Sequence, residues 1–499
     1  MLTKFFGKKI DHPMADVKSA QALLADLPRN DALKSAIELT EWIESVASSE
    51  EFGLADQFAV LSLLDETAQF YARKLACEYF TLPDMHIFQG NRLRLVMGNL
   101  SRQTADAYYM MFMRYCNGDK GGVAIKAPLL AARAVRAMRE KLKYTAVQYE
   151  VHDGAIWRNL AQFCQHAEWQ QYLDTPVSLY SALPETTSVG SEVGQLMAWY
   201  ACGLDSLSPR GMHLAERIIA QYRNVITISA NLPAHVLCGF DLSRAGTPVR
   251  INLDATMHPL MRYVSLADMQ VKLEMLIKIL HKNIVPQELH LGGVFTAEWV
   301  LEAAQHVLTC IVSPPQRLTK RRELTAQFSV VSGCENVLAY GAGQESGEHM
   351  QITLENASSS GFCAILTGKG VDGVRIGHLF GVQTASGLGV AIVRRLSRDI
   401  GGQLHVGAQV LANQAPVLTV RQSVGGGEEQ HALWLRESVE NGTARLLMQA
   451  GIFSMQRSLK AHFDGRNCLL IPVELQERGP DYELATFRVI EQEETEKQD

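Results

Sequence analysis

The pattern of apolar residues changes at a diproline near residue 314, and this change constrains the fold more than any other feature of the sequence. Before it, over about 310 residues, apolar side chains recur every three or four positions, which is the period of an amphipathic helix. Pro314 and Pro315 end the last of these segments, because proline cannot continue a helix. After them, short β-branched or alternating runs are separated by glycines, as is typical of strands. The sequence therefore predicts a helical region followed by a β-rich region.

The clearest predicted helix runs over residues 265–283. Ser265 and Asp268 have the S-x-x-D spacing of a capping box. An apolar stripe follows at alternating spacings of three and four, formed by Leu266, Met269, Leu273, Leu276 and Leu280. We expect this stripe to pack in a core rather than to bind a partner helix. Further helices are predicted at 31–47, 54–78, 128–144, 192–203, 211–222 and 297–312, with short strands at 226–228 and 249–251.

Beyond the diproline the sequence predicts short strands at 327–331, 351–355, 363–366, 378–383, 390–396, 403–411, 417–421, 432–436, 444–448, 468–475 and 484–490. Strands of this length with turn signals between them favour one or two small barrels or a sandwich. The last nine residues hold five acids and one lysine, so we expect a solvated tail at 491–499.

Composition excludes several classes of protein. Of the 499 residues, 47% are hydrophobic and 20% are charged, which is enough apolar material for packed cores and too much for a disordered chain. The net charge of −6 is spread evenly, because residues before Pro314 hold 29 bases and 32 acids, and the rest hold 18 and 21. A general nucleic-acid coat needs a basic footprint, which this chain lacks. Recognition of an anion must therefore be local.

Three further sequence patterns indicate the cellular compartment of the protein and argue against a metal site. No two of the nine cysteines are closer than 24 residues, so no zinc-ribbon spacing exists, and we expect reduced, mostly buried thiols. The first ten residues lack the apolar segment of a signal peptide, and no run approaches the ~18 apolar residues of a membrane span. We expect a cytoplasmic protein without a transmembrane segment. The 15 histidines show no tight metal spacing, and His213, His235 and His258 are expected to be structural.

Two local motifs suggest a ligand site. The segment from Gln316 to Arg322 follows the diproline and carries four cations in its last six residues, Arg317, Lys320, Arg321 and Arg322. About 35 residues later, Asn356, Ser358 and Gly361 form a polar N-x-S-x-x-G turn between two apolar runs. Taken alone, the first motif is typical of a solvated linker and the second of a hairpin turn.

Together these motifs resemble the PilZ domain, a small β-barrel found in bacterial receptors of the second messenger cyclic di-GMP. The family signature is R-x-x-x-R followed some thirty residues later by D/N-x-S-x-x-G, which Arg317–Arg321 and Asn356–Gly361 match in order and spacing. The runs at 376–381, 390–394 and 405–409 also resemble the later strands of that domain. The resemblance covers about 100 of the 499 residues, roughly 315–415.

The resemblance implies residue roles that agree with the chemistry of the ligand. Cyclic di-GMP carries two phosphodiesters and two guanines, and arginine can pair with phosphate, donate to guanine O6 and N7 and stack on a purine. Arg317 and Arg321 would take these roles, while the motif fixes none for Arg322. Asn356 and Ser358 would offer side-chain oxygens to the ligand, and Gly361 would allow close approach. Ordering of the arginine segment on binding would then be a disorder-to-order switch.

The expected organisation is a helical output or partner-binding region at 1–312, possibly two subdomains, a PilZ-like barrel at 313–415, and a β-rich extension or second small barrel at 416–490. The expected function is a cyclic di-GMP-binding effector that changes conformation or partner binding, with no cofactor. One alternative is a PilZ-like interaction or scaffold protein that has lost the ligand. Another is a nucleic-acid-binding protein that uses the cations at 317–322 together with a second basic cluster, which we expect on the solvated side of a helix and which consists of Arg133, Arg136, Arg139, Lys141 and Lys143. The oligomeric state is open.

An enzyme is not expected. Residues 426–430 spell G-G-E-E-Q, which departs at its last position from the GG-D/E-E-F signature of the cyclases that make cyclic di-GMP, and short predicted strands surround it. No E-A-L segment lies in a barrel-like context, and no G-x-S-x-G motif occurs. We therefore assign no catalytic and no metal-binding residue.

Overall fold

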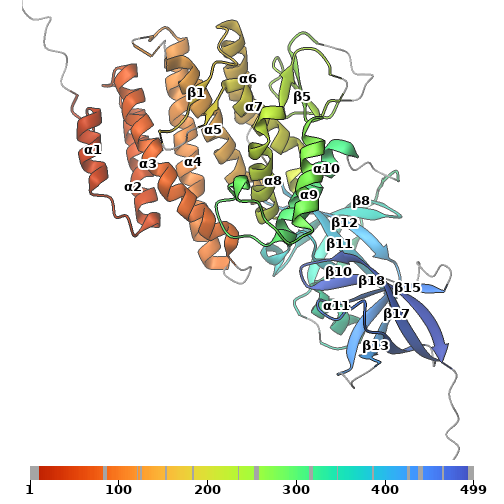
Figure 1. Ribbon diagram of the computed structural model, residues 1–499. Helices are drawn as coiled ribbons and strands as arrows, with labels where there is room; N and C mark the ends of the chain where they lie inside the picture. The colour runs from red at the N-terminus through yellow and green to blue at the C-terminus, as the bar shows by residue number, and fades with distance from the viewer. Residues whose placement is uncertain are drawn as a thin grey trace, which may run out of the picture. The chain divides into compact units, whose positions relative to one another are not determined.

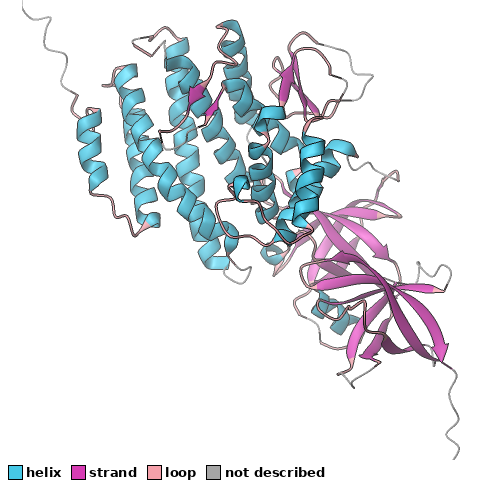
Figure 2. Cartoon of the chain, viewed as in Figure 1, coloured by secondary structure: helices cyan, strands magenta, loops and turns pink. Residues whose placement is uncertain are grey.

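The chain divides into two compact units, Met1–Pro315 and Gln316–Asp499, the first helical and the second built of strands (Figures 1 and 2). The computed structural model describes residues 10–82, 87–120, 122–123, 126–151, 154–181, 185–233, 235–251, 258–313, 319–345, 347–384, 387–423, 428–435, 442–463 and 466–492. Helices followed by an antiparallel barrel and further strands are the predicted fold class, which is confirmed.

The helical unit surrounds one large apolar core. Its α-helices are α1 (Val17–Ala25), α2 (Ala32–Ser48), α3 (Leu54–Thr81), α4 (Ile87–Cys116), α5 (Ala127–Ala146), α6 (Gly154–Trp169), α7 (Val189–Ala201), α8 (Pro209–Gln221), α9 (Met269–Leu280) and α10 (Ala297–Val312). Short polar residues begin several of them, since a side-chain oxygen can accept from a free backbone N–H of the first turn. Asp31 accepts in this way at α2, and Ser188 at α7.

Helix α9 begins later than predicted. Ser265 is the last residue of a strand and pairs with Thr227, so it cannot cap the helix, and the predicted capping box is wrong. Asp268 occupies the N-cap position but its side chain accepts no bond there. The apolar stripe of α9 is nevertheless buried along its whole length, as predicted.

Two small sheets accompany the helices. β1 (Val177–Ser178) pairs with β2 (Thr186–Thr187), and β3 (Thr227–Ser229), β5 (Met261–Ser265) and β4 (Cys238–Asp241) form a second sheet in that order. The strand predicted at 226–228 is therefore confirmed within one residue. The strand predicted at 249–251 is reduced to a single bridge from Val249 to Gly239.

The second unit begins with a six-stranded antiparallel barrel. Its pairings run β7-β8-β9-β12-β11-β10 and return to β7, which closes the sheet on itself. The strands are β7 (Gln327–Ser332), β8 (Met350–Ser358), β9 (Gly361–Thr367), β10 (Leu379–Thr384), β11 (Gly387–Arg398) and β12 (Leu404–Ala412). Side chains alternate between the interior and the outer face, as the period of a strand requires. The two-residue strand β6 (Arg322–Glu323) pairs with β8 on the edge that β7 leaves open.

The strands from 417 onward close a second barrel, in the order β13-β14-β15-β18-β17-β16. They are β13 (Val417–Gln422), β14 (Gln430–Leu435), β15 (Thr443–Gln449), β16 (Leu459–Phe463), β17 (Arg466–Arg478) and β18 (Tyr482–Gln492). The sequence left two possibilities open for this segment, an extension of the first barrel or a second small barrel. The structure shows a second barrel.

The two barrels share a core, so the second unit folds as one body. The short helix α11 (Cys334–Gly341) packs against strands of both, and one cluster of buried residues joins Val331 and Ile392 of the first barrel to Leu447 and Leu484 of the second. A bidentate ion pair reinforces the junction, because Arg394 of β11 donates to both carboxylate oxygens of Glu477 in β17, at 2.7 and 2.6 Å.

Two sequence expectations can be compared with the described part of the chain. None of its helices is both long and apolar enough to cross a membrane. All nine cysteines are free, and six of them are buried, in agreement with the predicted reduced thiols.

Candidate functional site

The hairpin that joins β8 to β9 carries three of the predicted site residues. Ser358 and Gly361 face each other across a two-residue turn, and Asn356 lies two residues further down β8. A Cβ atom on Gly361 would lie 2.5 Å from the carbonyl oxygen of Ala408 in β12. Glycine is therefore required by the packing of the barrel itself, since that contact is too short for any side chain.

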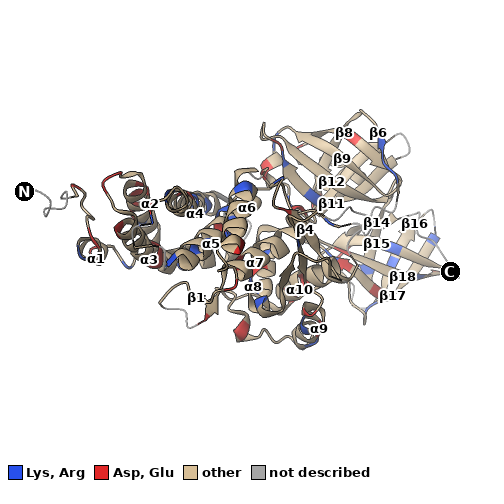
Figure 3. Cartoon of the chain, turned by 90° about the horizontal axis from the view of Figure 1, so that it is seen from above, with Lys and Arg blue, Asp and Glu red and all other residues tan. Residues whose placement is uncertain are grey.

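The described part of the basic segment, residues 319–322, lies along the same hairpin. Strand β6 lies beside the end of β8 (Figure 3), and in this pairing Arg322 is opposite Ala357 and Glu323 is opposite Asn356. The Arg321 guanidinium donates to the amide oxygen of Asn356 at 2.8 Å, so the two motifs are in direct contact. A second contact joins the Thr319 hydroxyl to that of Ser360 at 2.9 Å.

The remaining predicted residues differ in how they are placed. Ser358 donates to the Gly361 carbonyl at 3.1 Å, which leaves its oxygen able to accept. Arg322 is exposed, and Arg321 and Asn356 are half-buried. Arg317 lies outside the described residues. The structure thus brings Arg321, Asn356, Ser358 and Gly361 together at one edge of the barrel, with Arg322 beside them.

A polar cluster next to this edge was not predicted from the sequence. The Glu355 carboxylate accepts from the Cys363 thiol at 3.2 Å and lies 3.2 Å from His405 Nδ1, while His405 Nε2 lies 3.5 Å from Asp399. Burial opposes ionisation of Glu355, but the bonds from Cys363 and His405 prevail and lower its pKa. Burial and the neighbouring Glu355 charge raise the pKa of Cys363 to about 11, so its thiol stays protonated. The sequence held a signal for this cluster. Side chains alternate in direction along a strand, and Cys363 and His405 each follow a buried apolar residue of β9 or β12, so both are expected on the outer face.

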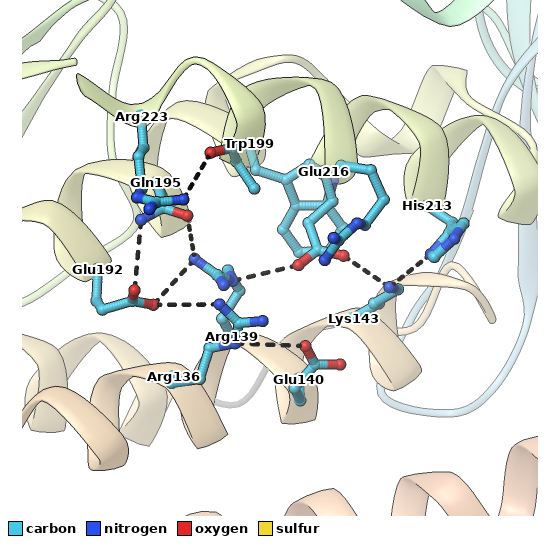
Figure 4. A network of polar contacts seen from close by, with 12 residues as sticks. Arg136, Arg139, Glu140, Lys143, Glu192, Gln195, Trp199, His213, Glu216 and Arg223 are labelled. Atoms are coloured by element: carbon cyan, nitrogen blue, oxygen red, sulfur yellow. Dashed lines mark hydrogen bonds and ion pairs between the residues drawn. The ribbon is translucent and has the colours of Figure 1, made fainter. Parts of the chain in front are cut away.

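The basic cluster of α5 is mostly buried, contrary to the prediction of a solvated face. Arg133, Arg139 and Lys143 are each less than 5% exposed. Arg136 and Lys141 keep about a fifth of their side chains exposed. The physical reason is that acids from three other helices enclose α5. Glu192 of α7 and Glu216 of α8 face it (Figure 4), and Asp65 of α3 pairs with Arg133.

These charges form one continuous network. Arg139 lies 3.2 Å from Glu192 and 3.3 Å from Glu216, and donates to the Gln195 amide oxygen at 3.0 Å. Lys143 pairs with Glu216 at 2.6 Å. Burial opposes ionisation of Glu216, but Lys143 and Arg139 hold its pKa well below the ordinary range, so the carboxylate stays charged.

His213 ends the network. Its ring stacks on Phe80, and burial together with the neighbouring Lys143 charge lowers its pKa well below the usual value. The ring is therefore neutral. Nδ1 accepts from Lys143 at 2.8 Å and Nε2 donates to the Leu291 carbonyl at 2.8 Å, which assigns the tautomer. This agrees with the structural role predicted for His213.

A pocket of about 570 Å³ opens beside this network within the helical unit. Its lining includes Arg136, Lys143, Glu192, Glu216 and Arg217. The sequence offered one signal that was overlooked. Alanines lie close to the arginines of α5 in the sequence, at 131, 132, 134 and 137. Small residues beside the charged ones are typical of a helix that is packed on every side by other helices.

The comparisons with known proteins concern the helical unit. Residues 18–234 match the family model described as the N-terminal domain of the cyclic-di-GMP receptor FimW. The match begins within α1 and ends beyond β3, so it contains α5, α7 and α8 and the buried charge network. Over this stretch the chain is similar to a family of cyclic di-GMP receptors. No curated protein and no solved structure matches the chain.

Proposed function

We propose that the protein is a cyclic di-GMP-binding effector, and that the ligand binds at the edge of the first barrel formed by β6 and the β8–β9 hairpin. The contact of 2.8 Å between Arg321 and Asn356 carries the proposal, because it brings the two halves of the PilZ-like signature onto one surface. The match of residues 18–234 to the receptor family supports the same ligand from the other unit of the chain.

The chemistry of this edge suits a dianionic purine ligand. A guanidinium has five N–H donors, and the bond to Asn356 uses one of them, so Arg321 keeps donors for phosphate or for guanine O6 and N7. Asn356 and Ser358 add acceptors for guanine N–H groups. Arg317, which precedes Arg321 by four residues, would hold the second phosphodiester or stack on a base.

Such a site would couple ligand binding to the segment that joins the two units. Residues 319–323 already lie against the barrel through β6 and the contact of Arg321 with Asn356, and a ligand that contacts both Arg317 and Arg321 would extend this attachment toward the helical unit, which is an ordering step available to an effector. In this proposal the barrel at 313–415 binds the ligand and the helical region at 1–312 binds a protein partner. The role is that of a binding effector without a catalytic residue or a cofactor.

The nucleic-acid alternative loses one of its two supports. It used a basic patch at residues 133–143, and most of the cations in that patch are buried against carboxylates rather than presented to a polyanion. The interaction or scaffold alternative remains, and it predicts no ligand.

Calorimetric titration of the full chain with cyclic di-GMP tests the proposal. We expect a dissociation constant of about 10 µM or lower, which corresponds to about 7 kcal/mol of binding free energy, and no comparable heat with GMP. Arg317→Ala should weaken binding at least about tenfold, because a charge-assisted contact is lost. Absence of binding by the wild-type chain would refute the receptor role and favour the scaffold. Equal binding by Arg317→Ala would remove Arg317 from the site.

A further inference from the structure

The pocket of the helical unit has the size and lining of a small-molecule site. Its volume of about 570 Å³ lies in the range of ligand pockets, which combine apolar walls with a few convergent polar groups. One wall is made by Ala68, Ala72 and Ala76 of α3, which are four residues apart and share one face of the helix. Leu179 and Tyr180, which follow β1, and the two threonines of β2 also line the pocket.

Most of the carboxylates that line the pocket already have close donors. Glu216 accepts from Lys143 at 2.6 Å, Glu192 accepts from Thr187 at 2.9 Å, and Asp65 accepts from Tyr108 at 2.7 Å. Glu185 is bonded to Arg223. The charges of three of these acids are shared with cations outside the lining, because Arg139 lies 3.2 Å from Glu192 and 3.3 Å from Glu216, and Arg133 lies 4.0 Å from Asp65.

Two arginines of the lining have no carboxylate at hydrogen-bond distance. Arg136 forms two long ion pairs, with Glu192 at 3.8 Å and Glu140 at 3.9 Å, and both acids lie beyond the range of a hydrogen bond. Burial opposes the charge of Arg136, but these acids prevail and raise its pKa. Arg217 donates its Nε–H to the His290 carbonyl at 2.9 Å, and no carboxylate of the described chain lies within 4.0 Å of it.

The two guanidinium groups also act on each other. Burial and the repulsion of Arg136 and Arg139 prevail over the attraction of Glu216 and Glu140, and they lower the pKa of Arg217. A half-buried arginine beside another cation is costly unless an anion neutralises it. Arg73, which is exposed, lines the same pocket and adds a third cation.

We propose that this pocket binds a small organic anion, a carboxylate or a phosphate, whose oxygens bridge Arg136 and Arg217. The planar fork of a guanidinium donates two parallel N–H bonds to either oxyanion, and two forks suit a group with three or more acceptor oxygens. The alanine wall and Leu289 would cover the apolar part of the molecule. This site lies in the helical unit and is separate from the proposed cyclic di-GMP site of the barrel.

Titration of the full chain with sodium phosphate and with sodium citrate, against sodium chloride at equal ionic strength, tests the proposal. Binding is read from the thermal unfolding temperature and from calorimetry, and the more effective anion tells whether phosphate or carboxylate is preferred. We expect at least one of them to raise the unfolding temperature in a saturable way that chloride does not reproduce. Arg136→Gln and Arg217→Gln should each weaken binding at least about tenfold.

Three further variants make the result specific. Ala72→Leu keeps every charge and fills the pocket, so it should also abolish the effect even if an arginine variant fails to fold. Arg102→Gln changes an exposed arginine of α4 outside the lining, and Arg321→Ala changes the barrel site, so both should bind the anion as the wild-type chain does. Saturable binding that Ala72→Leu retains, binding lost in Arg321→Ala, or no anion-specific effect in the wild-type chain would each overturn the proposal. None of these results bears on cyclic di-GMP binding itself.

Discussion

Replacing Glu216 by glutamine is expected to destabilise the helical unit by about 3–5 kcal/mol, because the change leaves buried cations without a counter-charge. Lys143 and Arg139 both pair with this carboxylate, and all three side chains are less than 5% exposed. Glutamine keeps the shape of the residue but removes its charge. The loss would therefore come from electrostatics rather than from a cavity.

Unfolding of the full chain by urea, followed by the helical signal in circular dichroism, measures this effect. Asp106→Asn is the matched control, since Asp106 pairs at 2.8 Å with Lys141, which is on the same helix as Lys143 but partly exposed. An exposed pair contributes about 1 kcal/mol or less, so the control should change the unfolding free energy little. Similar losses from both variants would contradict the account of α5 as a buried charged helix.

Arg321→Ala is expected to weaken cyclic di-GMP binding by about 100-fold, which is the effect of losing two charge-assisted hydrogen bonds of about 1.5 kcal/mol each. Arg321 is half-buried and directly precedes β6, outside the six strands that close the barrel, so its removal should leave the fold intact. Arg321→Lys retains the charge but not the planar fork, and should bind with an intermediate affinity.

The matched control for Arg321 is Arg466→Ala in the second barrel. The Arg466 side chain is 66% exposed and pairs with Glu491 at 2.7 Å, away from β6 and the β8–β9 hairpin. Its removal should leave the affinity for cyclic di-GMP unchanged. If Arg321→Ala binds as tightly as Arg466→Ala, the ligand does not contact Arg321, and the assignment of the site fails.

The β-rich half was the more predictable part of the fold. Each of the eleven predicted strands is present, because alternation of buried and exposed residues in a barrel is a local property of the sequence. Strand β16 was missed although Leu459 and Ala461 alternate with Lys460 and His462, since five residues give a weak signal. Strand β6 has two residues and exists only because β8 offers an open edge.

In the helical half, short sequence patterns did not predict every helix or the burial of its charged residues. The 30-residue helix α4 was not predicted, because two glycines, Gly90 and Gly98, and two asparagines, Asn91 and Asn99, lower its intrinsic preference for a helix. Packing against α2, α3 and α5 overrides that preference. The burial of Arg133 and Arg139 was likewise not predictable from α5 alone, since their partners come from residues 65, 192 and 216.

For the candidate site, sequence alone predicted which residues belong together but not how they meet. The contact between Arg321 and Asn356 spans 35 residues and depends on β6 adding to β8. Glu355 and His405 were missed because they belong to no motif and meet through the pairing of β8, β9 and β12. The pocket of the helical unit was missed because its lining comes from several helices.

Hydrogen exchange of the full chain with and without cyclic di-GMP tests the central claim most directly, since it reports where the ligand acts. The account predicts slower exchange in peptides that cover Arg317–Glu323 and the β8–β9 hairpin. It predicts little change in α3 and α8, which line the pocket of the helical unit. Protection confined to those helices, or unchanged exchange at Arg317–Glu323 under saturating ligand, would contradict a cyclic di-GMP site on the barrel.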